Sequence, residues 1–209
     1  MCWETAYEQW LNAPALSQQE QEELRAIQKD KMELRERFYA PLAFGTAGLR
    51  GTMKVGLHHM NVHVVRWVTQ GFAEVICAES DWAGDRKAAV CMDGRKNSRR
   101  FAEAAAEVLA ANGITVYLFD GPRPTPELSF AVRAYGCLAG INITASHNPK
   151  EYNGYKAYWC DGAQLQTETA MAVSARLEEI DVFAGPKRMD LQRGIELGRI
   201  CLLGRSCDE

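Results

Sequence analysis

The sequence lacks long apolar runs and a strong charge of either sign. No stretch approaches the roughly 20 apolar residues that span a membrane. The first residues, MCWETAYEQW, are acidic where a secretory signal needs an apolar core. A total of 24 Lys and Arg against 27 Asp and Glu leaves a net charge of −3. We therefore expect a cytoplasmic protein with no membrane or nucleic-acid partner, in which any anion site is a local basic cluster.

Paired cysteine motifs are also missing. The seven cysteines are odd in number and include no CxxC, so they support neither a disulfide framework nor a zinc site. Most fall in expected strands or helices, where a free cysteine behaves as a small apolar residue in a reducing compartment. His59 and His63 have i, i+4 spacing without an acidic companion, which favours a place at the entry to a helix over a metal site.

The chain does contain a charged, helical N-terminal stretch. With 209 residues and an apolar fraction of 47%, it suits one domain plus an appendage. Ser17 followed by Glu20 has the spacing of a capping box, which predicts the start of a helix. We expect residues 1–40 to form a helical extension, laid over the domain as an exposed helix.

Buried strands alternate with helices over residues 41–182. Asn61 and Ser98 are the expected N-caps of two of these helices, and Gly113 ends the second. This alternation predicts a three-layer α/β/α domain with a mainly parallel or mixed sheet. The predicted strands are 87–93, 114–120, 138–146 and 153–159, and the predicted helices are 61–80, 98–113, 126–135 and one starting near 167.

Two segments are predicted to be irregular. Residues 42–56 carry four glycines, a density that argues against a helix or a packed strand. From Phe183 the periodic pattern disappears. We expect residues 183–209 to be a linker towards a second domain that this chain lacks.

Ser146 lies at the predicted carboxyl end of a strand, where α/β domains bind ligands. It lacks the flanking glycines that a nucleophile elbow requires. Its neighbour His147 should point away from it in an extended chain. A serine hydrolase is therefore disfavoured. A role for Ser146 or Asn148 in satisfying the amides of a turn remains an alternative.

Basic side chains and free backbone amides surround Ser146 in the sequence. A turn at Asn153-Gly154 would bring Lys156 back towards Ser146. The stretch FGTAGLRG offers backbone N–H groups and Arg50, and DGRKNSRR offers Arg95 at a helix N-terminus. Backbone amides, helix N-termini and Arg forks are the groups that hold phosphate, so together they predict that Ser146 handles a phosphoryl group.

The motif TASHNP-x-x-YNG-x-K, together with FGTAGLRG, resembles the α-D-phosphohexomutase superfamily of phosphoglucomutases and phosphomannomutases. The similarity runs in order through most of the chain. The helical extension and the KAYW-x-DGAQ stretch resemble the phosphoglucomutase and phosphopentomutase branch more than the mannose-type enzymes.

The resemblance implies a role for each matching residue. Ser146 matches the serine that carries a phosphoryl group, passes it to a hexose monophosphate to give a bisphosphate, and takes back the other phosphate. Lys156 matches the general acid/base, Arg50 the arginine beside the phosphoserine, and His147 a contact to substrate or catalytic phosphate. The resemblance also implies phosphate or substrate contacts from Asn148, Arg95, Thr46 and Gly48.

The chain matches only the first of the four domains that the family carries. It lacks counterparts of the Asp-rich D-G-D-x-D-R loop, the loop that reads the sugar hydroxyls and the loop that grips the non-reacting phosphate. Mg²⁺ would thus have only the Ser146 phosphate as a ligand from this chain. We expect a hexose phosphate substrate, activation by glucose 1,6-bisphosphate, the missing C-terminal domains as partners, and no activity for the chain alone. A non-catalytic phosphate- or protein-binding module, or a subunit of a split enzyme, is the alternative.

Overall fold

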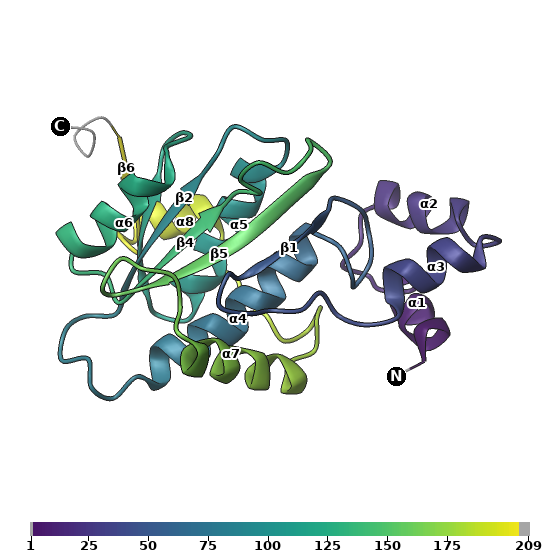
Figure 1. The fold of residues 1–209 in the computed structure, drawn as a ribbon, viewed down its shortest axis with the longest axis horizontal. Coiled ribbons are helices and arrows are strands. Elements are labelled where there is room, and N and C mark those ends of the chain that lie inside the picture. Colours follow the sequence, from purple (N-terminus) through teal and green to yellow (C-terminus); the bar gives the residue numbers. More distant parts are fainter. Residues whose placement is uncertain (1, 205–209) are drawn as a thin grey trace.

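The structure, a computed structural model, describes residues 2–204 and is built on one mixed sheet (Figure 1). The strand order is β1-β5-β4-β2-β3-β6. The strands are β1 Leu49–Thr52, β2 Lys87–Met92, β3 Thr115–Phe119, β4 Ala139–Ile143, β5 Tyr152–Trp159 and β6 Ile200–Leu203. The helices are α1 Trp3–Leu11, α2 Gln18–Ala26, α3 Lys31–Phe38, α4 Val62–Ala78, α5 Ser98–Ala111, α6 Thr125–Ala134, α7 Thr167–Glu179 and α8 Leu191–Glu196. The predicted α/β class is confirmed.

The connection between two strands decides whether they run parallel. β2, β3 and β4 are joined through α5 and α6, and they pair in parallel. Only the short segment 144–151 joins β4 to β5, and these strands are antiparallel because a parallel crossover needs a longer connection. β1 then pairs with β5 antiparallel at the edge of the sheet.

Helices cover the sheet in two layers. α5 contacts β2, β3 and β4, and it also contacts α4 and α8, while α4 contacts α7. α6 contacts β2 and β4. The crossovers through α5 and α6 run in opposite directions along the sheet, so right-handed connections place these two helices on opposite faces. The face that carries α6 is therefore the less covered one, which matters for the site below.

The N-terminal extension is three helices, not the single exposed helix predicted (Figure 1). The capping box is confirmed, because Ser17 accepts from the Glu20 N–H and the Glu20 carboxylate accepts from the Ser17 N–H. Asp30 separates α2 from α3, because its side chain caps α3 by accepting from the N–H groups of Met32 and Glu33. The extension is also anchored, since the side chains of Trp10, Leu24 and Phe38 are buried in the core.

Two segments that were predicted to be a loop and a turn are strands. The glycine-rich stretch contains β1, which the predicted loop over 42–56 missed, because pairing with β5 supplies the hydrogen bonds that its own sequence cannot. Asn153-Gly154 lies inside β5 and is not a turn. A Cβ on Gly154 would lie 2.6 Å from the Thr144 carbonyl oxygen, so this glycine permits close approach of the backbones.

The helix caps were predicted with mixed success. Asn61 caps α4 by accepting from the Val64 N–H, as predicted. Gly113 follows the end of α5 with φ +82°, also as predicted. The predicted cap at Ser98 was wrong, because Asn97 precedes α5 with φ 65° and the Ser98 hydroxyl donates to Asp93 Oδ1 at 2.7 Å.

The segment beyond Phe183 has regular structure, against the prediction of a patternless tail. It forms α8 and β6, and β6 pairs in parallel with β3 to extend the sheet. Ile200 and Leu203 are buried, while Leu202 is exposed. A pattern of only four residues is too short to predict a strand from the sequence. The domain at 41–182 thus shares its sheet with residues beyond its predicted end. That the chain leads on to a further domain stays a prediction, and residues 205–209 lie outside the described part.

The remaining expectations concern membranes and cysteines. Within residues 2–204, no helix is both long enough and apolar enough to cross a membrane. Cys91 and Cys137 are buried and free, and burial raises the pKa of each thiol to about 12. At that pKa they behave as apolar residues, not as reactive thiols.

Candidate active site

Ser146 projects from a strained turn just beyond the sheet. β4 ends at Ile143, earlier than predicted, although the Thr144 N–H still donates to the Gly154 carbonyl at 3.0 Å. Ser146 has φ 55°, a left-handed conformation that costs a non-glycine residue about 1–2 kcal/mol. Its N–H donates to Thr144 Oγ1 at 3.1 Å, which helps to hold that conformation. The strained turn leaves Ser146 exposed to solvent.

Strand register places Arg50 and Lys156 on one face of the sheet. Arg50 pairs with Gly154, two residues before Lys156, and Lys156 pairs with Asn142 of β4. Paired residues and residues two apart share a face of the sheet. The Asn142 amide donates to Thr125 of α6 at 2.8 Å, so this is the face that α6 covers only in part. Both cations therefore rise from open sheet next to the Ser146 turn.

A cavity of about 400 Å³ gathers these groups. It brings together Ser146, His147, Lys156, Arg50 and Gly48, which lie on separate segments of the sequence. We call it the Ser146 cavity. Its lining residues in the described chain include no carboxylate. They are Ala43, Ala47, Gly48, Leu49, Arg50, Thr144, Ser146, His147, Lys156 and Gln164.

The Ser146 hydroxyl lies next to the His147 ring. Ser146 Oγ and His147 Nδ1 are 3.3 Å apart, a long hydrogen bond whose direction depends on the tautomer. The sequence predicted that these adjacent side chains point apart. That prediction assumed an extended chain, and the left-handed φ of Ser146 removes the assumption.

A contact between Arg50 and Asn148 links β1 to the loop after Ser146. Arg50 Nη1 donates to Asn148 Oδ1 at 2.8 Å. Arg50 is exposed, and this is the only hydrogen bond of its guanidinium among the described residues. Its remaining guanidinium N–H groups are open to a ligand, and a guanidinium binds two phosphate oxygens side by side.

Arg95 holds the backbone of the loop that follows Ser146. Nη2 donates to the carbonyls of Ser146 and Asn148 at 2.8 and 2.7 Å. Nη1 donates to the carbonyls of Pro149 and Tyr152 at 2.8 and 3.3 Å. Nε lies 3.3 Å from a carboxylate oxygen of Asp93. Its donors are taken up by the protein, so we infer that Arg95 positions the loop and does not bind phosphate itself.

The turn at 45–48 forms one wall of the Ser146 cavity. Gly48 has φ +77°, and a Cβ there would lie 1.9 Å from the Tyr155 carbonyl oxygen. Glycine is required because the turn lies directly against β5. Thr46 lies exposed in the same turn and does not line the cavity, so the structure does not bring it to Ser146.

Two polar lining residues were not predicted from the sequence. Thr144 accepts the Ser146 N–H, and Gln164 faces the cavity from beyond the turn at Asp161-Gly162. An isolated bridge between Tyr158 and Gln164 folds that segment back along β5. The Asp-Gly turn is the signal that could have placed Gln164 near Lys156.

The described residues do not form a magnesium site by themselves. Nowhere in residues 2–204 do three or more His, Cys, Asp or Glu side chains converge as metal ligands. Ser146 is the one predicted ligand position, while Mg²⁺ prefers octahedral oxygen ligation. Carboxylates from outside the described chain would have to complete such a site.

Comparison with known proteins gives consistent matches. Residues 41–183 match the family description "Phosphoglucomutase/phosphomannomutase, alpha/beta/alpha domain I". A phosphoglucomutase of Staphylococcus aureus strain USA300 is 44% identical over 153 residues, which are 73% of this chain and 27% of that protein. This chain therefore spans about a quarter of the length of the curated relatives it matches.

Solved structures agree with these matches. A putative phosphomannomutase from Thermus thermophilus superposes with a TM-score of 0.61 at 33% identity, covering 73% of this chain and 34% of that one. The open form of parafusin, a phosphoglucomutase from Paramecium, has a TM-score of 0.56 at 24% identity, covering 68% of this chain and 26% of that one. The second likeness concerns the fold alone.

Proposed function

This chain belongs to the phosphoglucomutase/phosphomannomutase family as its α/β/α domain I, and on that premise we propose that Ser146 carries the transferred phosphoryl group. The observation that supports this most directly is the cavity in which an exposed, strained Ser146 lies among Arg50, His147 and Lys156. Phosphoryl transfer asks a protein mainly for positioning and for charge stabilisation, and this cavity offers both.

Each side chain of the Ser146 cavity has a role in this proposal. Arg50 binds the oxygens of the phosphate on Ser146 with the N–H groups that Asn148 leaves free. Lys156 exchanges a proton with the hydroxyl that gains or loses the phosphoryl group. His147 lies beside Oγ and contacts the same phosphate. The absence of carboxylates from the described lining suits an anionic group.

The full reaction requires more than this chain contains. We propose that the complete enzyme interconverts hexose 1-phosphate and hexose 6-phosphate in the cytoplasm, through phosphorylated Ser146 and a sugar bisphosphate. The sugar must then be bound in two opposite orientations, and Mg²⁺ needs carboxylates that the described residues do not gather. The isolated chain is therefore proposed to be inactive as a mutase, with glucose 1,6-bisphosphate as the donor that phosphorylates Ser146.

Intact-protein mass spectrometry tests the central step. The chain is expected to carry one phosphoryl group, either as purified or after incubation with glucose 1,6-bisphosphate. Fragmentation of the protein should locate this group on Ser146. Ser146→Ala should gain none. Ser80→Ala, which removes an exposed serine of a distant loop, should gain it as the wild type does. If Ser146 gains no phosphate under either condition, the proposal fails in favour of a phosphate- or protein-binding module.

A coupled assay tests the proposed inactivity separately. Conversion of glucose 1-phosphate to glucose 6-phosphate by the phosphorylated chain should not exceed that of Ser146→Ala. Turnover that depends on Ser146 would show that this chain alone presents the sugar in both orientations. That outcome would contradict the proposed inactivity of the isolated chain, but not the proposed role of Ser146.

A further inference from the structure

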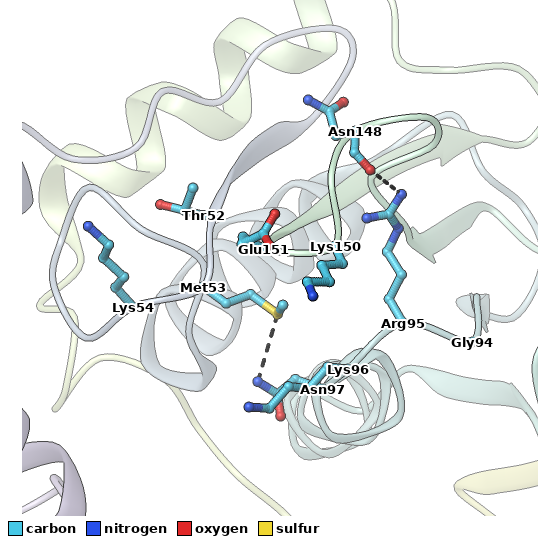
Figure 2. A pocket seen from close by; sticks show the side chains of 10 residues that line it. All are labelled: Thr52, Met53, Lys54, Gly94, Arg95, Lys96, Asn97, Asn148, Lys150 and Glu151. Atoms are coloured by element: carbon cyan, nitrogen blue, oxygen red, sulfur yellow. Dashed lines mark hydrogen bonds between the residues drawn. The ribbon is translucent and has the colours of Figure 1, made fainter.

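A second and larger cavity is lined in part by the loop that follows Ser146 (Figure 2). It has a volume of about 930 Å³ and shares no lining residue with the Ser146 cavity. It opens at the edge of the sheet where β1 and β2 end, and we call it the edge cavity. Its lining residues are Thr52, Met53, Lys54, Gly94, Arg95, Lys96, Asn97, Asn148, Lys150 and Glu151.

Some basic side chains of the edge cavity are paired with other groups of the protein, and others are not. Lys54 Nζ lies 2.9 Å from Glu33, and Arg95 is held by Asp93 and the loop carbonyls. Lys96 and Lys150 are exposed and have no carboxylate within ion-pair distance among the described residues. These two ammonium groups are therefore available to a ligand.

Acidic groups do not cancel this charge. Glu151 is the one acidic residue in the described lining. Figure 2 shows its carboxylate directed away from the ammonium group of Lys150, which points towards Asn97. Asp93 lies outside the lining, and its Oδ1 accepts from the Ser98 hydroxyl and the Arg95 N–H. The cavity floor between Lys96, Lys150 and Asn97 thus remains cationic.

A helix end adds to the same field. Residues 94–97 line the cavity and lead directly into α5, which runs for 14 residues (Figure 2). The first N–H groups of a helix have no partner within it, and they carry partial positive charge. The Ser98 N–H at the start of α5 already donates to the Arg95 carbonyl at 3.1 Å, so the helix end contributes its dipole to the field, while Lys96 and Lys150 supply the charged donors for a phosphate.

We propose that the edge cavity binds the phosphate group of a small phosphorylated ligand through Lys96, Lys150 and the start of α5. This site goes beyond the phosphoryl-carrying role of Ser146 and does not depend on it. Lys150 belongs to the loop whose carbonyls Arg95 holds, so occupancy of the edge cavity also immobilises the segment that follows Ser146.

Titration of the ¹⁵N-labelled chain with inorganic phosphate, at constant ionic strength made up with chloride, tests this site. The amide signals of residues 94–98 and 150–152 should shift and saturate together. In the double variant Lys96→Gln/Lys150→Gln, the affinity reported by these signals should fall by about tenfold or more, because two charge-assisted contacts are lost.

Matched variants separate this site from general electrostatics and from the Ser146 cavity. Lys29→Gln/Lys31→Gln removes the same charge from the exposed turn between α2 and α3 and from the start of α3, and this variant should bind as the wild type does. Lys156→Gln, which changes a lining residue of the Ser146 cavity, should leave the edge-cavity shifts unchanged. Shifts that do not saturate, that persist equally in the Lys96/Lys150 variant, or that occur only around residues 46–50 and 146–147 would overturn the proposal.

Discussion

Two arginines that line different cavities contact the loop after Ser146, and their surroundings differ sharply. On the side of the edge cavity, Arg95 gives its guanidinium donors to four backbone carbonyls and to Asp93. On the side of the Ser146 cavity, Arg50 is exposed and its guanidinium makes one hydrogen bond, to the Asn148 side chain, in the described chain. The guanidinium of Arg95 thus binds the protein's own backbone, whereas the guanidinium of Arg50 remains available to a ligand.

This difference teaches that an arginine near a phosphate site must be judged by the partners of its N–H groups. Backbone carbonyls need partners when they are removed from water, and Arg95 supplies them for a loop with a strained residue. Arg50 leaves donors without partners in the described structure, as expected of a group kept ready for an anion. Two predictions test this comparison directly, and two more test the strained turn and the N-terminal helices, in order from the largest expected effect to the smallest.

Arg95→Met should lower the free energy of unfolding by about 2–4 kcal/mol, because several carbonyls lose their donor and Asp93 loses its counter-charge. Urea denaturation followed by circular dichroism measures this. Arg50→Met is the matched control and should change stability by less than about 0.5 kcal/mol. An equal loss of stability in the two variants would contradict the structural role assigned to Arg95 alone.

Arg50→Met should slow phosphorylation of Ser146 by glucose 1,6-bisphosphate about 10²-fold, the size expected for removal of one preorganised donor to a transition state. Arg50→Lys should recover only part of the rate, since lysine keeps the charge but not the planar fork. Time-resolved mass spectrometry gives both rates. A wild-type rate in Arg50→Met would show that the free donors of Arg50 are not used in the transfer.

Ser146→Gly should be more stable than Ser146→Ala by about 1 kcal/mol, because glycine adopts φ 55° without a steric cost. The usual order is the reverse. Ser174, within α7, is the matched position, and there alanine should be more stable than glycine by about 1 kcal/mol. The same order at both sites, measured by thermal unfolding, would argue against strain at Ser146.

A change to acidic pH tests a third region, the N-terminal helices. Burial would raise the pKa of Glu20, but the His63 ring 3.3 Å away and the hydrogen bonds from Ser17 outweigh it and lower the pKa from 4.5 to about 2. The folded pKa lies below the unfolded one, so the stabilisation is present above pH 4.5 and is lost as the pH falls towards 2.

Glu20→Gln should therefore be less stable than the wild type at pH 7, and the difference should shrink below about pH 4.5. Urea denaturation at several pH values measures this. Glu22→Gln, which changes an exposed carboxylate of the same helix, is the control and should show no such pH-dependent difference. A Glu20→Gln difference that stays constant down to about pH 2.5 would contradict the capping and ion-pair role of Glu20.

The sequence alone determined the features that depend on neighbours along the chain. The α/β class, the capping box at Ser17 and the cap at Asn61 follow from apolar periodicity and from hydrogen bonds that span a few residues. The residues of the candidate site were identified through a resemblance in motif, and the structure gathers Ser146, His147, Lys156, Arg50 and Gly48 in one cavity. Their roles in phosphoryl transfer remain predictions.

Tertiary structure decided what depends on distant partners. Arg95 and Ser146 are 51 positions apart, so the sequence could not show that the guanidinium of Arg95 is used by the loop. β1 and β6 are strands because β5 and β3 pair with them, which their own short or glycine-rich sequences do not predict. Likewise, the contacts of the turn with Thr144 and Arg95 accompany the left-handed conformation that turns the Ser146 hydroxyl towards His147. Backbone hydrogen bonds between remote segments settle these features, because only folding brings their donors and acceptors together.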